Sequence, residues 1–184
     1  TRPGIAWLNN PAFAGPKYLE EAVRSLDHTD AAGYLLETNS MVHEAEHAGQ
    51  IAFQLAHDLP IPPQDVRELS AQLTETVYGP SPHISVAQKF LVTEMGNAAG
   101  ASPEIIQAAS TFIEHLEQYA GPLRGSPIIP EDELIQLAKT ALDDEINRRY
   151  RRDFGRRVAF EDVVDVSLLK NVREFVERNQ PDLI

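Results

Sequence analysis

The segment His43-Glu44-Ala45-Glu46-His47 holds the side chains of this sequence that are best suited to chemistry. On a helix, His43 and His47 lie one turn apart on the same face, so both imidazoles can reach a single metal ion. Glu44 lies at the edge of that face, where its carboxylate can take a proton from a metal-bound water. The H-E-x-x-H pattern therefore predicts a hydrolytic site with one Zn²⁺ ion, in which His43 and His47 are ligands and Glu44 is the general base.

The sequence allows two other interpretations of the motif. In the first, the motif arises by chance, which composition predicts in roughly two chains of a hundred, and both histidines form ordinary hydrogen bonds with Glu44 and Glu46. In the second, Glu44 and His47 form the Glu-x-x-His element of a di-iron helical bundle, which needs a second element of this kind. No other histidine of the sequence has a glutamate three residues before it, so the di-iron interpretation fails.

The motif and its surroundings resemble the zincin metallopeptidases. In that family, the H-E-x-x-H helix follows the edge strand of a small sheet, and this strand binds the substrate backbone. Residues 33–38 match the strand by position, and His47-Ala48-Gly49-Gln50 is similar to the H-A-x-Q that follows the motif in many bacterial zincins. The resemblance covers residues 33–50 and implies an endopeptidase that hydrolyses peptide bonds of a protein substrate.

A zincin needs a third protein ligand, and its type separates the subclasses. The metzincin pattern requires a glycine and a histidine where this chain has Gln50 and Phe53. The gluzincins instead take a glutamate from a later helix. We expect this ligand to be Glu94, because it lies on a predicted helix and is followed by small residues that allow close approach to the motif helix. The other candidates for the ligand are Glu75, His57 and His83.

A further donor is expected near the metal, because zincins often stabilise the tetrahedral oxyanion with a tyrosine or histidine side chain. Tyr78, His83 and His115 are the candidates. The sequence does not choose among them, and a surface or locally bonded histidine is the alternative interpretation of His115.

The elements that would position these residues follow from periodicity and from helix breakers. Short apolar stretches at 5–8 and 33–38 predict strands, with a short helix over 16–26 between them. From residue 40 onward, helical apolar spacing and intervening prolines and glycines predict helices over about 40–57, 63–78, 85–99, 103–120, 131–151 and 164–177. The expected fold is mainly α with a small N-terminal β element, an α+β fold of minimal zincin-like type with the motif on a central helix.

Length and composition limit the other choices. The 184 residues, of which 42% are hydrophobic, predict a single domain over 1–184. The chain begins at Thr1 without an initiator methionine, and we expect a processed chain or a fragment of a longer one. It contains no cysteine, so disulfides, thiolate ligands and a cysteine nucleophile are excluded, and a metal must be held by histidine and carboxylate groups.

Charge and hydropathy bear on partners. The 28 acidic and 16 basic residues give a net charge of −12, which argues against nucleic acid as a partner and favours a basic substrate segment. No apolar run approaches the roughly 20 residues that a membrane span needs. By analogy with compact zincins among bacterial effectors and toxins, we expect a virulence-type protease that is secreted or delivered into a host cell. The substrate and the oligomeric state do not follow from the sequence.

The basic cluster of residues 148–157 departs from the acidic average. Cationic side chains in the last turn of a helix complement the helix dipole, which is the structural interpretation of this cluster. The functional interpretation is a docking surface for an acidic partner or for a substrate carboxylate. The competing class of protein is accordingly a helical protein-interaction module in which the H-E-x-x-H motif is inactive or accidental.

Overall fold

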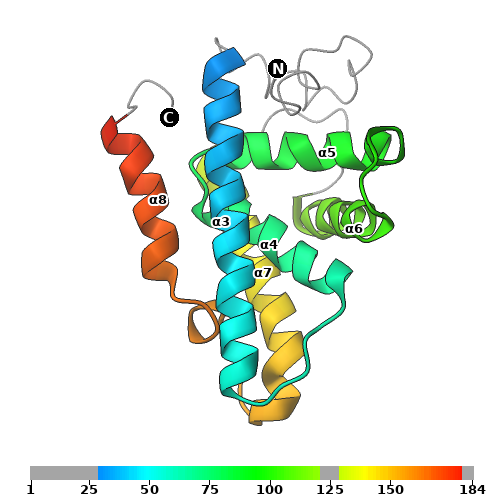
Figure 1. Cartoon of the computed structure of the whole chain (residues 1–184), viewed down its shortest axis with the longest axis vertical. Helices are drawn as coiled ribbons and strands as arrows, with labels where there is room; N and C mark the ends of the chain where they lie inside the picture. Colours follow the sequence, from blue (N-terminus) through cyan, green and yellow to red (C-terminus); the bar gives the residue numbers. More distant parts are fainter. Residues whose placement is uncertain (1–28, 121–128, 180–184) are drawn as a thin grey trace.

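The computed structural model describes residues 29–120 and 129–179 (Figure 1). Within these ranges the chain forms α-helices, one short 3₁₀ helix and no strand. The elements are α3 (Thr29–Ala56), α4 (Gln64–Tyr78), α5 (Pro82–Ala99), α6 (Pro103–Ala120), α7 (Glu131–Phe154), η2 (Phe160–Asp162) and α8 (Val166–Asn179). The strand predicted at 5–8 and the helix predicted at 16–26 lie outside the described residues.

The predicted α+β fold is wrong for the described part of the chain, which is all-α. Residues 33–38, expected to form a strand, lie within α3, which continues without interruption into the H-E-x-x-H segment. The buried side chains of Leu35, Thr38, Asn39 and Val42 recur every three or four residues, which is the period of a helix. The short apolar window at 33–38 did not distinguish the two structures, and packing of this face decides in favour of the helix.

The later helices confirm the sequence prediction, and their ends lie close to the predicted ones. Pro82 occupies the first turn of α5, where its missing N–H is not needed. Gly155 ends α7 in a left-handed conformation with φ of 62°, which a glycine adopts without steric cost. These residues mark helix ends in this chain, although Gly49 and Gly96 lie inside α3 and α5.

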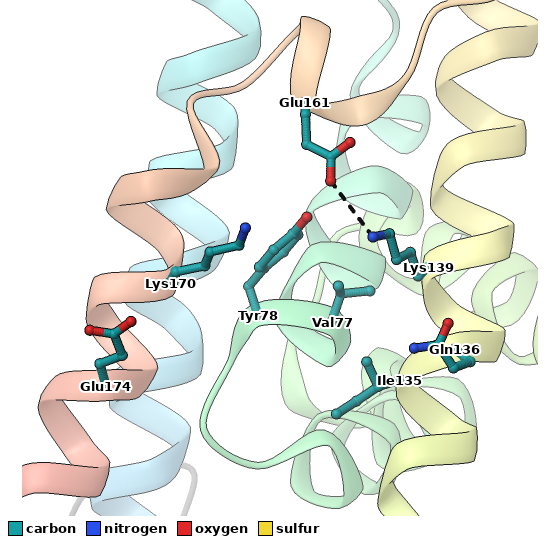
Figure 2. Close-up of a pocket in the computed structure, with 8 residues that line it drawn as sticks. All are labelled: Val77, Tyr78, Ile135, Gln136, Lys139, Glu161, Lys170 and Glu174. Carbon is teal, nitrogen blue, oxygen red and sulfur yellow. Dashed lines mark ion pairs between the residues drawn. The ribbon is translucent and has the colours of Figure 1, made fainter.

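Helix α4 is the central element of the described structure. All residues from 69 to 80 are buried, and α4 packs against α3, α6 and α7, with further contacts to α5 and α8. In Figure 1, α4 crosses behind α3. Helix α8 runs beside α3, on the side away from α5 and α6. Leu73 of α4 belongs to one apolar core that also includes Phe90, Phe112 and Ile146. A cleft opens between α4, α7 and α8 (Figure 2).

Close contacts fix how α3 packs on its neighbours. The Nδ2 atom of Asn39 donates a hydrogen bond of 3.1 Å to the backbone carbonyl of Ser81, and a Cβ atom at Gly79 would overlap the Asn39 side chain. On the same helix, a Cβ atom at Gly49 would lie 3.0 Å from Cγ1 of Val164, just before α8. The first contact holds α3 against the end of α4, and the second holds it against the segment before α8. Among the described helices, none combines the length and apolarity that crossing a membrane requires.

Candidate metal centre

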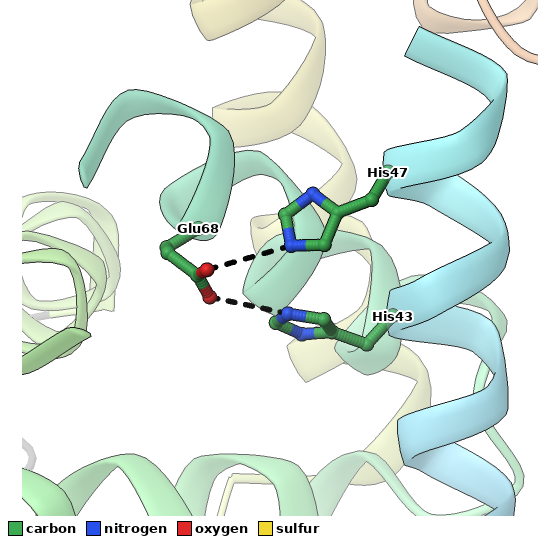
Figure 3. Close-up of side chains that lie close together, drawn as sticks. All are labelled: His43, His47 and Glu68. Atoms are coloured by element: carbon green, nitrogen blue, oxygen red, sulfur yellow. Dashed lines mark ion pairs between the residues drawn. The ribbon is translucent and has the colours of Figure 1, made fainter. Parts of the chain in front are cut away.

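Three side chains from two helices meet in an arrangement that could hold a metal ion. His43 and His47 project from α3, and Glu68 projects from the second turn of α4 (Figure 3). Their donor atoms all lie within 4.8 Å of one another. The Nε2 atom of His43 is 3.2 Å from one carboxylate oxygen of Glu68, and Nε2 of His47 is 3.6 Å from the other.

This donor set suits zinc in chemistry and in spacing. Two imidazole nitrogens and one carboxylate oxygen are a ligand set of hydrolytic zinc sites, which leaves a fourth position for water. Zinc–ligand bonds of about 2.0–2.2 Å in tetrahedral geometry separate neighbouring ligand atoms by roughly 3.4 Å. The observed distances of 3.2 and 3.6 Å lie on either side of that value. The residues present therefore fit a zinc ion with small side-chain adjustments.

Local sequence features bring these residues together. The spacing of four residues puts His43 and His47 on one face of α3, and their rings meet edge to face with centroids 4.6 Å apart. Residues 59–63 contain three prolines, which keep the chain from continuing as a helix. The chain then turns so that α4 packs on α3. Glu68 meets the histidines, while Leu69 enters the core.

A buried carboxylate orients the imidazole of His43. Its Nδ1 atom lies 2.7 Å from Oε1 of Glu75, which follows Glu68 by two turns on α4. An ionised carboxylate can only accept a hydrogen bond, so the proton of this bond resides on Nδ1 of His43. Nε2 is then left to bind a metal, an arrangement common among metal-binding histidines.

Neighbouring polar groups stabilise the negative charge of Glu75. Nζ of Lys89 on α5 lies 2.7 Å from Oε2 of Glu75, and the hydroxyl of Ser85 donates to the same oxygen at 3.2 Å. Burial alone would raise the pKa of Glu75, but the charge of Lys89 and the hydrogen bond with His43 outweigh burial and hold this pKa below its ordinary value. Glu75 is therefore an ionised acceptor within the protein interior.

The second histidine faces a different carboxylate. Nδ1 of His47 lies 3.5 Å from Oε2 of Glu46. Both atoms are buried, and neither has a hydrogen-bond partner in the described structure. Burial raises the pKa of Glu46, against the opposing effects of Ser70, His47 and other neighbours. Glu46 thus faces His47 across a longer distance, without the hydrogen bond that Glu75 makes with His43.

Glu46 belongs to a buried polar network that joins α3, α4 and α7. The side-chain amide of Gln50 donates to Glu46 and, at 2.7 Å, to the hydroxyl of Ser70. Arg149 donates to the side-chain oxygen of Gln50 and, at 2.8 Å, to the backbone carbonyl of Val66. Buried polar groups are tolerated when they are paired in this way. The network therefore fixes the buried side of the histidine pair.

Without a metal ion, this cluster holds a proton. Burial alone would lower the pKa of His43, but hydrogen bonds to Glu68 and Glu75 raise it to about 9. Hydrogen bonds from His43 and His47 hold the pKa of Glu68 well below its usual range. A metal ion on Nε2 of His43 has to displace the proton from that atom, so metal binding competes with protonation.

Glu44 lies on the exposed side of the histidine pair. At about 100° per residue, Glu44 and Glu46 fall on opposite sides of the line that joins His43 and His47. Glu46 is fully buried, whereas Glu44 is exposed. The histidine side chains are each 15% exposed, so water can reach them from the side of Glu44. This is the side that a general base must occupy, and the role of Glu44 itself stays a prediction.

The other predicted metal ligands lie elsewhere or act differently. Glu94 is exposed on α5 and does not join the group of metal-binding side chains, where Glu68 takes its place. Glu75 lies at the site but contacts Nδ1 of His43. His57 follows the end of α3, with its ring 4.5 Å from that of Phe53. The signal for Glu68 was its position early on the helix that follows the proline-rich turn, where it packs directly on the motif helix.

The candidate oxyanion donors are not gathered at this centre. Tyr78 ends α4, about 15 Å along the helix axis from Glu68, and its ring stacks on that of Phe160. Nε2 of His83 lies 2.9 Å from the backbone carbonyl oxygen of Ile129. His115 lies on α6, and neither histidine belongs to the metal-binding group.

Three of the six arginines in the basic cluster of residues 148–157 pair with carboxylates of the same chain. The side chain of Arg149 is only 9% exposed and pairs with Glu145 at 3.3 Å. Arg148 pairs with the same carboxylate at 2.6 Å, and Arg156 pairs with Asp162 at 3.0 Å. Arg149 therefore has a structural role, whereas Arg151, Arg152 and Arg157 are exposed, and the docking surface stays a prediction.

No family model matches the chain, and neither a curated protein nor a solved structure matches it significantly. The likeness to zincins therefore depends on the motif residues, and its expected edge strand is contradicted by α3. Fold and site together define an all-α protein, over the described residues, with a candidate His₂Glu metal centre.

Proposed function

We propose that this protein is a zinc-dependent peptidase that hydrolyses a protein substrate at a centre formed by His43, His47 and Glu68. The observation that carries the proposal is the direction of the two imidazoles. Both turn Nε2 toward the Glu68 carboxylate, while their Nδ1 atoms face Glu75 and Glu46. A structural ion pair needs one histidine, whereas two converging imidazoles with outer carboxylates are typical of a metal site.

The roles of the side chains follow from this arrangement. Zinc at this centre supplies a Lewis acid that lowers the pKa of bound water to about 7. Glu75 keeps the proton of His43 on Nδ1, so that Nε2 stays available as a ligand. Glu44, on the exposed side, accepts the proton of the attacking water and passes it to the leaving amine. His43, His47 and Glu68 hold and orient the ion.

The proposed substrate site differs from that of a zincin, which binds its substrate along an edge strand. Residues 33–38 are helical, so the proposal includes no edge strand that binds the substrate as an added strand. The exposed side of α3 bears Glu44 together with Met41, which is 62% exposed, and Ala48. We place the peptide on this side, where an apolar contact lies close to the general base. The net charge of −12 favours a basic segment.

Metal analysis and one substitution test the proposal. The purified chain should contain one zinc ion, gain thermal stability from zinc, and cleave members of an unbiased peptide library. Glu44→Gln should keep the fold and the zinc ion while cleavage falls by about 10²- to 10⁴-fold. Glu133→Gln, an exposed carboxylate on α7, is the matched control and should change nothing.

Three results would refute different parts of the proposal. A chain without stoichiometric zinc and without zinc-dependent stabilisation refutes the metal centre, and leaves the helical interaction module with an accidental motif. Zinc binding without any cleavage refutes the peptidase and retains the centre. Full cleavage by the Glu44→Gln variant removes Glu44 from its role.

A further inference from the structure

A cleft of about 320 Å³ lies between α4, α7 and α8, lined by residues that the metal centre does not use (Figure 2). Its volume is at the lower end of the range of small-molecule sites, about 300–1,000 Å³. Val77 and Ile135 form an apolar part of the lining. The remaining lining is mostly charged, and it includes the hydroxyl of Tyr78. The cleft therefore offers both an apolar surface and directed polar groups to a small ligand.

The charged side chains of the cleft balance one another. Lys139 of α7 pairs with Glu161 of η2, with 3.6 Å between Nζ and Oε1. Lys170 and Glu174 lie one turn apart on α8, and both line the cleft. No ion pair joins Lys170 or Glu174 to another residue in the part of the chain that the structure describes. Each is therefore available to a ligand group of opposite charge.

Tyr78 contributes a hydroxyl that a ligand in the cleft can reach. The residue is only 7% exposed, and its ring stacks on Phe160 with centroids 5.7 Å apart. Figure 2 shows its hydroxyl directed into the cleft, between Lys170 and Glu161. The hydroxyl has no hydrogen bond to any other described residue. Burial, with the nearby charges of Glu161 and Asp143, raises the pKa of Tyr78 to about 12, so the hydroxyl is a neutral donor.

We propose that this cleft binds a small zwitterion with an apolar body, which is the chemistry of a free apolar amino acid or of a short apolar peptide. The ligand carboxylate lies against Lys170 and the Tyr78 hydroxyl, and its ammonium lies against Glu174. The aliphatic part covers Val77 and Ile135. Two lysines and two glutamates line the cleft, so a ligand that carries both charges and no net charge matches it better than an anion or a cation.

Leucine and its analogues test the two charge contacts separately. Backbone amide shifts of the ¹⁵N-labelled full chain are followed during titration with leucine, 4-methylpentanoate, leucinamide and Leu-Leu. 4-Methylpentanoate lacks the ammonium, and leucinamide lacks the carboxylate. Leucine should bind at least about 10-fold more tightly than either analogue, since each lost contact involves a charge-assisted hydrogen bond. The comparison of leucine with Leu-Leu distinguishes an amino acid from a peptide as the preferred ligand.

Two substitutions assign the contacts to residues. Lys170→Gln should weaken binding of leucine and of 4-methylpentanoate by about 10-fold, with leucinamide unaffected. Glu174→Gln should weaken leucine and leucinamide, with 4-methylpentanoate unaffected. Arg152→Gln makes the same change of charge as Lys170→Gln at the exposed end of α7, outside the cleft lining, and is the control.

The proposal is overturned if leucine and Leu-Leu both produce no saturable shifts, or if both analogues bind as well as leucine. It is also overturned if Lys170→Gln behaves like Arg152→Gln. The titrations are run with and without a chelator. Because the cleft uses no metal ligand, binding should persist in the chelator, so a failure of the zinc peptidase leaves this result intact.

Discussion

Oε1 of Glu75 lies 2.7 Å from Nδ1 of His43, while the other oxygen of the same carboxylate lies 2.7 Å from Nζ of Lys89. One buried carboxylate thus bridges a metal-binding imidazole and a buried ammonium. The bridge ties α3, α4 and α5 together at the centre. It makes the orientation of His43 depend on a residue that never touches the metal.

Replacement of Glu75 by glutamine should weaken zinc binding without removing the site. The glutamine amide cannot supply the charge that supports the Nδ1 proton, and loss of such an outer partner costs about 10- to 100-fold in metal affinity. A competition titration with a chromophoric chelator measures the change. Glu133→Gln is the control, and an affinity equal to that of the control would show that Glu75 does not position His43.

Glu68→Ala should reduce zinc affinity more than the replacement of Glu75 does. Glu68 is a proposed ligand, whereas Glu75 contacts only the ligand His43. Glu94→Ala should leave affinity unchanged, since Glu94 lies outside the metal-binding group. Zinc retention after dialysis against a weak chelator distinguishes the two variants. Normal retention by the Glu68 variant together with loss of zinc from the Glu94 variant would restore Glu94 as the third ligand.

Lys89→Met should destabilise the metal-free protein strongly, by about 3–5 kcal/mol, because it leaves the Glu75 carboxylate buried without its ammonium. The side chains of this pair are 6% and 4% exposed. Lys139→Met is a matched control, since it breaks a pair whose side chains are 43% and 45% exposed. The control should cost no more than about 1 kcal/mol. Urea unfolding measures both variants, and equal losses would contradict a buried ion pair at Glu75.

Stability of the metal-free protein should fall as pH rises from about 6.5 to about 9. The folded protein holds the His43 proton with a pKa of about 9, against 6.5 for the ordinary side chain. This contribution is complete below pH 6.5 and is lost as pH passes through the folded pKa, with a total on the order of 3 kcal/mol. Zinc affinity should rise across the same window, because the competing proton leaves.

The pH effect is checked by urea unfolding at a series of pH values, with His43→Gln as the control. The substitution should flatten the dependence between pH 6.5 and 9. In acid, Glu68 makes a second contribution, because its pKa is lower in the folded protein than in the unfolded chain. This contribution to stability is complete above the ordinary pKa of a glutamate and is lost as pH falls toward the lowered pKa of the folded protein. An unchanged slope in the His43→Gln variant would assign the titration to another group.

The sequence predicted most helices because its breakers are strong and local. Proline and glycine act on the backbone of a single residue, so Pro82 and Gly155 mark helix ends whatever packs around them. In the segment 33–38 this marker misleads, because Gly33 lies inside α3. The structure of this segment depends on the packing of Leu35 and Thr38 against the rest of the protein, which a six-residue window does not contain.

The candidate site was predictable where it depends on one helix. The spacing of His43 and His47 follows from helical geometry alone, and the structure brings both to one carboxylate. Glu68 and Glu75 belong to a second helix, so their positions depend on how α4 packs on α3. The choice of Glu94 depended on small neighbours of a later helix, which permit close approach but do not produce it.

Helix α4 carries Glu68 at one end of its length and Tyr78 at the other, so the metal centre and the cleft share one rigid element. Both positions move together if α4 shifts along its axis or turns about it. If a ligand at one site favoured one placement of α4, the affinity of the other site would change by the same free energy in either order of addition. The central helix therefore supplies residues to both sites as well as to the core.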